Sequence, residues 1–169
     1  MIKAILRLNN LLILFLNLNN MQRLNLPEYK FKIRQKGEKY EIFDKIRKKY
    51  VALTPEEWVR QNFIMYLINE KSVPESLIVI EQCLKYNKLA KRSDIVVYDN
   101  LPRPKIIVEC KATNINITQH TFDQIARYNM SLKVDYLIVT NGITHYCCII
   151  DYSNKSYRFI ENIPNYSEL

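Results

Sequence analysis

Two short runs of β-branched residues, Ile95–Val97 and Ile106–Val108, constrain the fold of this chain more than any other feature. Runs of this composition are typical of buried strands. The connector between them, residues 99–104, contains Asp, Asn and two Pro residues, which favour a turn. The sequence therefore predicts a hairpin around which the rest of the chain is organised.

Charged residues interrupt the apolar pattern at one end of this hairpin. Asp94 precedes the first run, and Glu109 and Lys111 follow the second. Because side chains alternate along a strand, Glu109 and Lys111 share one face while Cys110 points to the other. If the two strands pair, Asp94 lies opposite Glu109. Two carboxylates and an ammonium group then converge at one end of a sheet.

This convergence has a chemical use. The carboxylates of Asp94 and Glu109, with the backbone carbonyl of Cys110, are ligands that suit a hard divalent cation such as Mg²⁺. Such a cation polarises a phosphodiester and lowers the pKa of a bound water. Lys111 can orient that water or stabilise the charge that develops on the phosphate. Each residue alone is more often a solvated strand end, but the combination favours a functional site.

The pattern resembles the D…E-x-K signature of the PD-(D/E)XK nuclease superfamily. More narrowly, residues 21–151 resemble the N-terminal nuclease-like domain of type I restriction enzyme R subunits. Four phrases carry this resemblance, in the order TPEEWVRQ (Thr54–Gln61), KRSDIVVYD (Lys91–Asp99), IIVECKA (Ile106–Ala112) and QIARYN (Gln124–Asn129). The resemblance implies an α/β fold with a restriction-endonuclease-like core, in which helices flank a central mixed sheet and extra β strands lie at the N and C ends.

A first helix is predicted from Thr54 to about Glu70. Thr54 can cap it, Pro55 suits its first position, and Glu57 completes a capping box. The resemblance places an acidic residue of the first helix near the metal, and Glu57 is the candidate. The capping box explains Glu57 equally well, so both roles remain open.

A second helix is predicted from Thr118 to about Leu132. Gln124 and Tyr128 are four residues apart and share a face of it. They are similar to the Q-x-x-x-Y element of RecB-like superfamily members, which implies a place beside the active site, where the pair helps to hold lysine or substrate. The alternative is a structural pair, hydrogen-bonded locally.

Other segments complete the predicted fold. Further strands are expected at Tyr29–Arg34, Tyr40–Asp44, Leu77–Tyr86, Tyr136–Thr140, Tyr146–Asp151 and Tyr157–Ile160, with a basic loop at Lys45–Lys49. The second helix should connect the strand at Ile106 to that at Tyr136 by a right-handed parallel crossover. Lys88, Lys91 and Arg92, in a predicted turn beside Asp94, are candidate phosphate contacts, the alternative being a solvated turn. Arg60 and Gln61 are weaker candidates for contacts with DNA or with the site.

Composition limits the class of protein. A chain of 169 residues forms one domain. The formal charge of +8 favours a polyanionic partner such as nucleic acid. Only 2 Gly residues are present, which excludes a Gly-rich phosphate loop. The 4 Cys residues form no C-x-x-C pair and there are only 2 His residues, a pattern that disfavours zinc and indicates a reduced, cytoplasmic protein.

The ends of the chain differ from its centre. In residues 1–20, Lys3 and Arg7 precede an apolar run at Leu11–Leu16, as in a signal peptide, but no small-x-small cleavage site follows. The run is also too short to span a bilayer. We expect a mis-assigned upstream extension or a loosely attached tail, then a domain at residues 21–160 and a polar, frayed tail at 161–169. An export or anchor segment is the alternative.

The leading hypothesis is a DNA endonuclease domain that uses Mg²⁺ or Mn²⁺. Asp94, Glu109 and Cys110 would hold the metal and Lys111 would act on the water, with support from Gln124, Glu57 and Tyr128. R subunits carry an ATP-driven motor after this domain, and this chain has no Walker A motif. It would act alone or with separate motor, methylase or specificity subunits. The alternatives are a catalytically silent nucleic-acid-binding or assembly module of a restriction-type system, and an α/β domain with no DNA role.

Overall fold

The computed structural model describes residues 22–86, 89–129 and 133–169, without the side chains of residues 82–92, 124 and 127–129. The N-terminal extension expected at residues 1–20 and the candidate Lys88 lie outside this part. Within it, no helix combines the length and the apolar character needed to cross a membrane.

The central hairpin is confirmed. Strands β5 (Leu89–Tyr98) and β6 (Pro104–Cys110) pair antiparallel, with Ile95 opposite Val108. β5 also pairs with β4 (Ile78–Tyr86), which matches the strand expected there. The predicted turn is shorter than expected. Residues 89–92 continue β5, so Lys91 and Arg92 lie in a strand and not in a turn.

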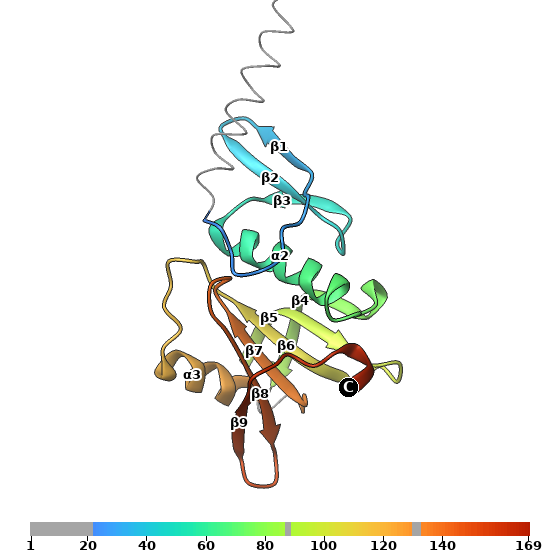
Figure 1. The fold of residues 1–169 in the computed structure, drawn as a ribbon, viewed down its shortest axis with the longest axis vertical. Helices are drawn as coiled ribbons and strands as arrows, with labels where there is room; N and C mark the ends of the chain where they lie inside the picture. Colours follow the sequence, from blue (N-terminus) through green and yellow to red (C-terminus); the bar gives the residue numbers. More distant parts are fainter. Residues whose placement is uncertain (1–21, 87–88, 130–132) are drawn as a thin grey trace, which may run out of the picture.

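The large sheet has six strands in the order β4-β5-β6-β7-β8-β9. Strands β7 (Tyr136–Thr140), β8 (His145–Asp151) and β9 (Ser156–Ile160) lie close to their predicted positions. β6 and β7 are parallel neighbours, joined through helix α3 (Gln119–Asn129), and the other pairs are antiparallel (Figure 1). The predicted mixed sheet and its parallel crossover are therefore confirmed.

Helix α2 (Pro55–Asn69) begins where the capping pattern placed it. The Thr54 hydroxyl accepts a hydrogen bond from the backbone N–H of Glu57 at 3.1 Å, and Pro55 occupies the first turn. Four of its apolar side chains are completely or almost completely buried against the large sheet: Val59, Phe63, Ile64 and Leu67. Cys110 and alternate residues of β5 and β6 belong to the same core cluster.

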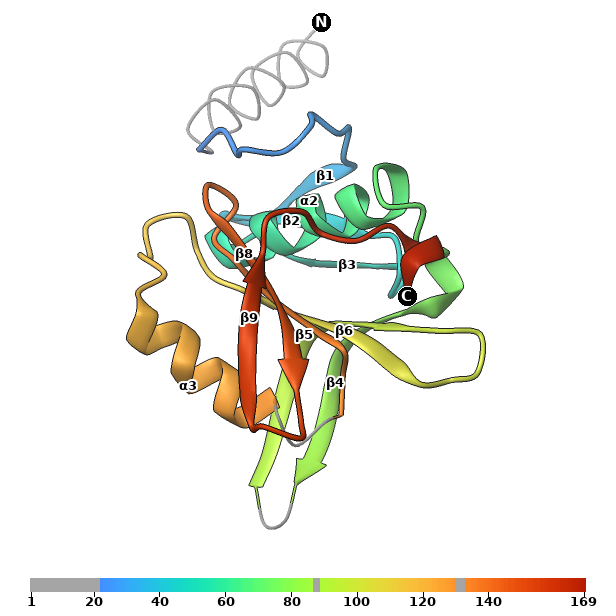
Figure 2. The ribbon, with the colours of Figure 1, turned by 60° about the horizontal axis from the view of Figure 1, so that its bottom comes forward.

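A second, three-stranded sheet packs on α2. It contains β1 (Ile33–Lys36), β2 (Lys39–Asp44) and β3 (Lys49–Ala52) in that order (Figures 1 and 2). The rings of Phe31 and Trp58 make an edge contact at 5.3 Å between centroids, which joins the segment before β1 to α2. The sequence prediction missed β3, and it placed the first strand at Tyr29–Arg34, about four residues too early at its start.

Helix α3 covers the opposite face of the large sheet (Figure 2). Phe122, Ile125 and Ala126 pack there against residues such as Ile107 and Leu137. The central strands β6 and β7, and Ile95–Val97 of β5, are thus buried on both faces, which explains why these segments are continuous apolar runs.

Both ends of the described chain pack back onto the core. The backbone N–H of Asn25 donates to the carbonyl of Gly142 at 2.7 Å. Gly142 has φ +83°, and a Cβ there would lie 2.7 Å from Leu24, so this close approach requires glycine. At the other end, Ile163, Tyr166 and Leu169 pack against the core on the α2 side, and the Tyr166 N–H donates to the Lys71 carbonyl at 2.8 Å. The tail at 161–169 is therefore packed, whereas the sequence suggested fraying.

Candidate active site

Asp94 and Glu109 lie at opposed positions of two neighbouring strands. Ile95 pairs with Val108, and one further step of the same register sets Asp94 opposite Glu109. Oδ2 of Asp94 accepts the backbone N–H of Cys110 at 2.7 Å, which fixes this carboxylate at the end of β6. The structure thus brings these two acidic residues together, as the hairpin pattern predicts.

Lys111 completes the group. Its Nζ donates to Oε1 of Glu109 at 3.0 Å, and its backbone N–H donates to the Thr140 carbonyl of β7 at 2.8 Å. Burial is the largest single influence and acts to lower the pKa of Lys111, but Glu109, Asp94 and Glu56 together outweigh it, and the pKa is raised above its usual value. Lys111 is therefore a cation at neutral pH, suited to stabilising negative charge and not to accepting a proton.

The side chain of Cys110 points away from this group. It is completely buried in the core cluster that includes Val59 and Phe63 of α2. Burial, followed by the charge of Asp94, raises the pKa of its thiol well above the usual value, so the thiol stays neutral. Only the backbone of Cys110 is available to the site, in agreement with the predicted alternation along the strand.

Arg60 of α2 has a larger part in the site than its weak sequence signal suggested. Its side chain is 7% exposed, and Nη2 donates to Oδ1 of Asp94 at 2.8 Å. Nη1 donates to Oε2 of Glu57 at 2.6 Å, and oxygens of Glu56 and Glu81 lie 3.4 Å from the guanidinium. One buried cation therefore faces four carboxylates, and it neutralises Asp94 from the helix side.

Two roles were open for Glu57, a capping box and a place near the metal, and the structure bears on the capping box. Its backbone N–H serves the cap, but the N–H of Thr54 donates to Ala52, so the reciprocal bond of a capping box is absent among these residues. The Glu57 carboxylate accepts instead from Arg60, from Arg47 at 3.0 Å and from Gln61 at 2.8 Å. It is joined to Asp94 through Arg60.

Sequence reasoning missed Glu56. Burial raises the pKa of this carboxylate, and the next largest cause is the charge of Asp94, with a further contribution from Glu109. Glu56 is therefore close enough to share the field of the acidic pair. The capping pattern drew attention to Glu57, and the only sequence signal for Glu56 was its place in the same TPEEW phrase.

Glu81 of β4 was missed as well. The pairs on either side of it, Ile80 with Ile95 and Gln82 with Ser93, set it opposite Asp94 on the other side of β5. Its backbone has φ 52°, a left-handed conformation that costs a non-glycine residue about 1–2 kcal/mol. The only sequence signal for Glu81 was one acidic residue within a predicted apolar strand.

A second arginine extends this ionic network to the small sheet. Arg47 donates through Nε to the completely buried Asp44 of β2 at 2.5 Å, and it also contacts Glu57 and Glu81 at 3.0 Å. Gln61 donates to Asp44 at 2.8 Å. A continuous chain of charge-assisted hydrogen bonds thus connects β2 with the carboxylate of Asp94.

Four predicted site residues cannot be placed by their side chains. Gln124 and Tyr128 lie in α3, and Lys91 and Arg92 lie in β5, but in each case the side chain is outside the described part. Lys88 is outside it altogether. Their roles remain predictions.

Two carboxylates and one backbone carbonyl are the oxygens that the site could offer to a cation. In the described part of the chain, no three acidic, imidazole or thiol side chains are grouped so that they could hold an ion. Asp94 and Glu109 supply two carboxylates, and Mg²⁺ typically uses one or two together with waters and substrate phosphates. The Cys110 carbonyl is a further hard oxygen at the same strand end.

Comparison with known protein families identifies the family of this chain. The family described as the type I restriction enzyme R protein N terminus matches residues 55–164. The chain belongs to this family. The match begins at the first residue of α2 and continues past β9, so it includes Asp94, Glu109 and Lys111. Strands β1–β3 of this R-protein N-terminal domain lie before the matched region.

Among solved structures, a fragment described as an HsdR subunit of a type I restriction enzyme from Vibrio vulnificus YJ016 is similar. The two share 21% identity with a TM-score of 0.49, over 69% of this chain and 24% of that chain. This chain thus spans about a quarter of that solved chain. A search of curated proteins found no match.

Proposed function

We propose that this domain is a metal-dependent endonuclease that hydrolyses phosphodiester bonds of DNA, and that it is a PD-(D/E)XK nuclease. The observation that carries the proposal is the placement of Asp94 of β5 opposite Glu109 of β6, with the ammonium of Lys111, the residue after β6, bound to Glu109. Membership of the R-protein N-terminal family supports a restriction-type context. The proposed cofactor is Mg²⁺ or Mn²⁺.

Asp94, Glu109 and the Cys110 carbonyl would hold the cation. When bound, it would polarise the phosphodiester and lower the pKa of a water. A water oxygen forms a bond to phosphorus and one bridging P–O bond breaks, which leaves a phosphate monoester and a hydroxyl group. Lys111, held as a cation by Glu109, donates hydrogen bonds to the water or to the phosphate oxygens and stabilises their developing charge.

The surrounding residues position this group. Arg60 donates to Oδ1 of Asp94, and Glu57 accepts from Arg60. Glu57 would therefore position Asp94 through Arg60 without touching the reacting atoms. We propose that Gln124 and Tyr128 approach from α3, and that Lys88, Lys91 and Arg92 contact phosphates. DNA is the proposed substrate, and separate motor, methylase or specificity subunits are proposed partners.

A catalytically silent nucleic-acid-binding or assembly module is the second candidate, and one observation favours it. Both oxygens of Asp94 already accept hydrogen bonds, one from Arg60 and the other from the Cys110 N–H. In a silent module this pairing is permanent and the site is a structural ionic cluster.

Plasmid nicking distinguishes the two candidates. The purified chain is incubated with supercoiled plasmid and with single-stranded DNA, in EDTA, Mg²⁺ or Mn²⁺, beside Lys111→Ala and the matched control Lys155→Ala. Metal-dependent nicking that only Lys111→Ala removes is the expected result. Absence of nicking, together with no Mn²⁺ binding by calorimetry, contradicts the nuclease proposal and favours the silent module.

A further inference from the structure

The small sheet has one face on α2 and one face open. Ile42 and Asp44 of β2 are completely buried, and Asp44 binds Gln61 of α2, so this side of the strand faces the helix. Because side chains alternate, Glu41 and Phe43 project from the other side. We call that side the outer face. It consists of Lys32, Arg34, Lys36, Lys39, Glu41, Phe43 and Tyr50, which the register of β1, β2 and β3 sets together.

The outer face is strongly cationic. Its four Lys and Arg residues are all exposed, and Glu41 is its one carboxylate. Glu41 is bound by Arg34 at 2.6 Å and by Lys36 at 3.5 Å. Lys36 lies directly opposite Lys39 in the ladder. Like charges at opposed positions destabilise a sheet, and a bound anion would offset their repulsion.

Aromatic rings beneath the cations hold two of them in place. The guanidinium of Arg34 lies 3.9 Å from the ring centroid of Tyr50, and Nζ of Lys32 lies 5.7 Å from that of Phe43. The two rings contact each other at 5.2 Å. These cation–π contacts restrict the side chains before any ligand arrives, which lowers the entropy lost on binding.

We propose that the outer face of β1–β3 is a DNA-backbone site that binds phosphates without reading base sequence. The choice of DNA as the polyanion rests on the proposed function. Phosphate contacts by Lys and Arg supply sequence-independent affinity for nucleic acid. The region is also separate from the matched family region, which begins at residue 55.

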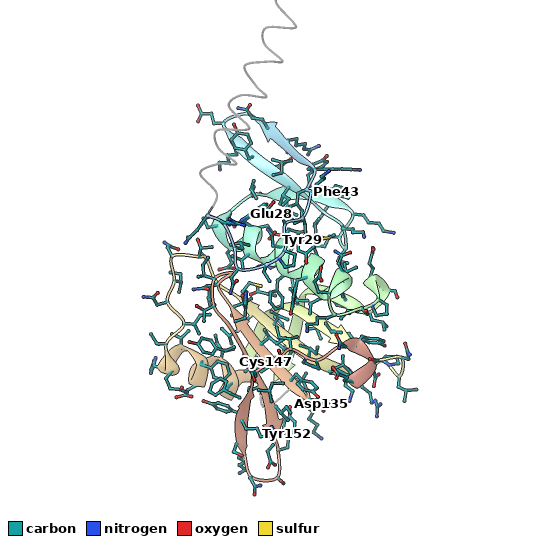
Figure 3. The ribbon with its side chains drawn as sticks, viewed as in Figure 1. Glu28, Tyr29, Phe43, Asp135, Cys147 and Tyr152 are labelled. Carbon is teal, nitrogen blue, oxygen red and sulfur yellow. The ribbon has the colours of Figure 1, made fainter. Side chains whose placement is uncertain are left out.

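The position of the outer face suits a holding role. Strand β2 presents Phe43 outward and Asp44 inward, and the hydrogen bonds of Asp44 and Arg47 continue to Glu57 beside Arg60. A phosphate backbone bound to β2 is therefore held on an element that is firmly connected to the candidate active site. Figure 3 labels Phe43 near one end of the molecule and Tyr152, next to the β8–β9 turn, towards the other.

Binding of the full chain to a fluorescein-labelled duplex in EDTA tests the proposal, since no cleavage occurs without metal. The triple variant Lys32→Gln, Arg34→Gln, Lys36→Gln should bind roughly ten- to a hundredfold more weakly near 100 mM salt, with a salt slope shallower by about 2–3. Glu41→Gln, which removes the one carboxylate, should bind a few-fold more tightly. The control Lys155→Gln, in the β8–β9 turn, should leave affinity unchanged.

The outcomes separate this proposal from the nuclease proposal. Unchanged affinity and salt slope in the triple variant, or weaker binding by Glu41→Gln, overturn the outer face as the DNA site even if the wild-type chain nicks plasmid. If binding falls in the triple variant while the wild-type chain nicks nothing in Mg²⁺ or Mn²⁺, the outer face stands and the nuclease proposal fails. Thermal melting of each variant confirms folding, and a gain of affinity in Glu41→Gln cannot arise from unfolding.

Discussion

Helices α2 and α3 cover opposite faces of the same sheet with different chemistry. The core contributed by α3 is apolar and aromatic, and the Phe122 ring lies 5.1 Å from that of Tyr157 and 4.8 Å from that of Phe159. Half of the buried residues of α2 are polar or charged: Glu57, Arg60, Gln61 and Asn62. Burial of apolar side chains alone could hold either helix on the sheet. The presence of buried charged residues beneath α2 therefore needs a separate explanation.

Buried ions are costly to desolvate, and well-packed apolar residues of the same volume often serve stability equally well. The ionic cluster under α2 therefore adds little to the stability of the folded protein. It surrounds Asp94, whereas the α3 face has no comparable cluster among its described residues. We interpret the contrast as a difference in what is buried: the α3 face buries apolar and aromatic side chains, and the α2 face buries charges that position Asp94.

The largest effect is expected for Arg60→Ala. Removing this buried cation leaves Glu56, Glu57, Glu81 and Asp94 facing one another, and breaking a buried ion pair typically costs about 3–5 kcal/mol. Urea unfolding measures the loss. Arg34→Ala is the matched control, because Arg34 also pairs with a glutamate but is exposed, and its loss should be under about 1 kcal/mol. Equal losses would show that burial of the ions is unimportant.

Phe122→Ala tests the other face. Truncation of a buried phenylalanine costs about 3–5 kcal/mol, here towards the lower end because Tyr146 and Phe159 beside it are partly exposed and can close the gap. Urea unfolding should show the same loss at low and high salt, because the truncation removes no ion pair. A loss that falls at high salt would contradict the apolar character that distinguishes this face from the α2 face.

A smaller effect separates the two roles of Glu57. Gln can replace Glu in a capping box, so Glu57→Gln would be nearly neutral if capping were the only role. Because the carboxylate binds Arg47 and Arg60, we expect a loss of about 2 kcal/mol, as for a hydrogen bond to a charged group. Thr54→Ala, which removes the cap alone, should cost about 1 kcal/mol. A smaller loss in Glu57→Gln than in Thr54→Ala would favour the capping role.

The same contrast explains how far the sequence could predict this molecule. The hairpin, α2, α3 and β7 follow from local signals, namely apolar runs, a capping pattern and turn residues. Asp94 and Glu109 could be paired because strand register follows from the hairpin. Strand β3 was missed because KYVA at Lys49–Ala52 is short and follows a basic run.

The ionic cluster could not be predicted in this way. The importance of Arg60, Glu56 and Glu81 depends on the packing of α2 against β4 and β5, which no local pattern encodes. The packed tail is a similar case, since Ile163 and Tyr166 are isolated apolar residues in a polar segment whose binding surface forms only in the fold. Sequence periodicity therefore does not predict which charged residues, distant in the chain, come together in the fold.

The smallest expected effect concerns a charge that is not buried beneath a helix. Asp151, at the start of the β8–β9 turn, accepts hydrogen bonds from the Ser153 hydroxyl at 2.5 Å and from the Asn154 side chain at 2.8 Å. The Ser153 hydroxyl first, and then Asn154, lower the pKa of Asp151 from 3.8 to about 2. Because the folded state favours the ionised form, this stabilisation is complete above about pH 4 and is lost as the pH falls towards about 2.

Asp151→Asn should therefore lower the melting temperature at pH 7 by less than Thr54→Ala does, and the difference from the wild-type chain should shrink between about pH 4 and about pH 2. Melting curves at pH 7, 4 and 3 measure it. Ser153→Ala is the companion variant, since it removes the leading cause of the pKa shift and keeps the carboxylate. A deficit in Asp151→Asn that stays constant with pH would show that the turn depends on the shape of the side chain and not on its charge. The exposed turn would then differ in kind from the buried cluster around Arg60, and not only in magnitude.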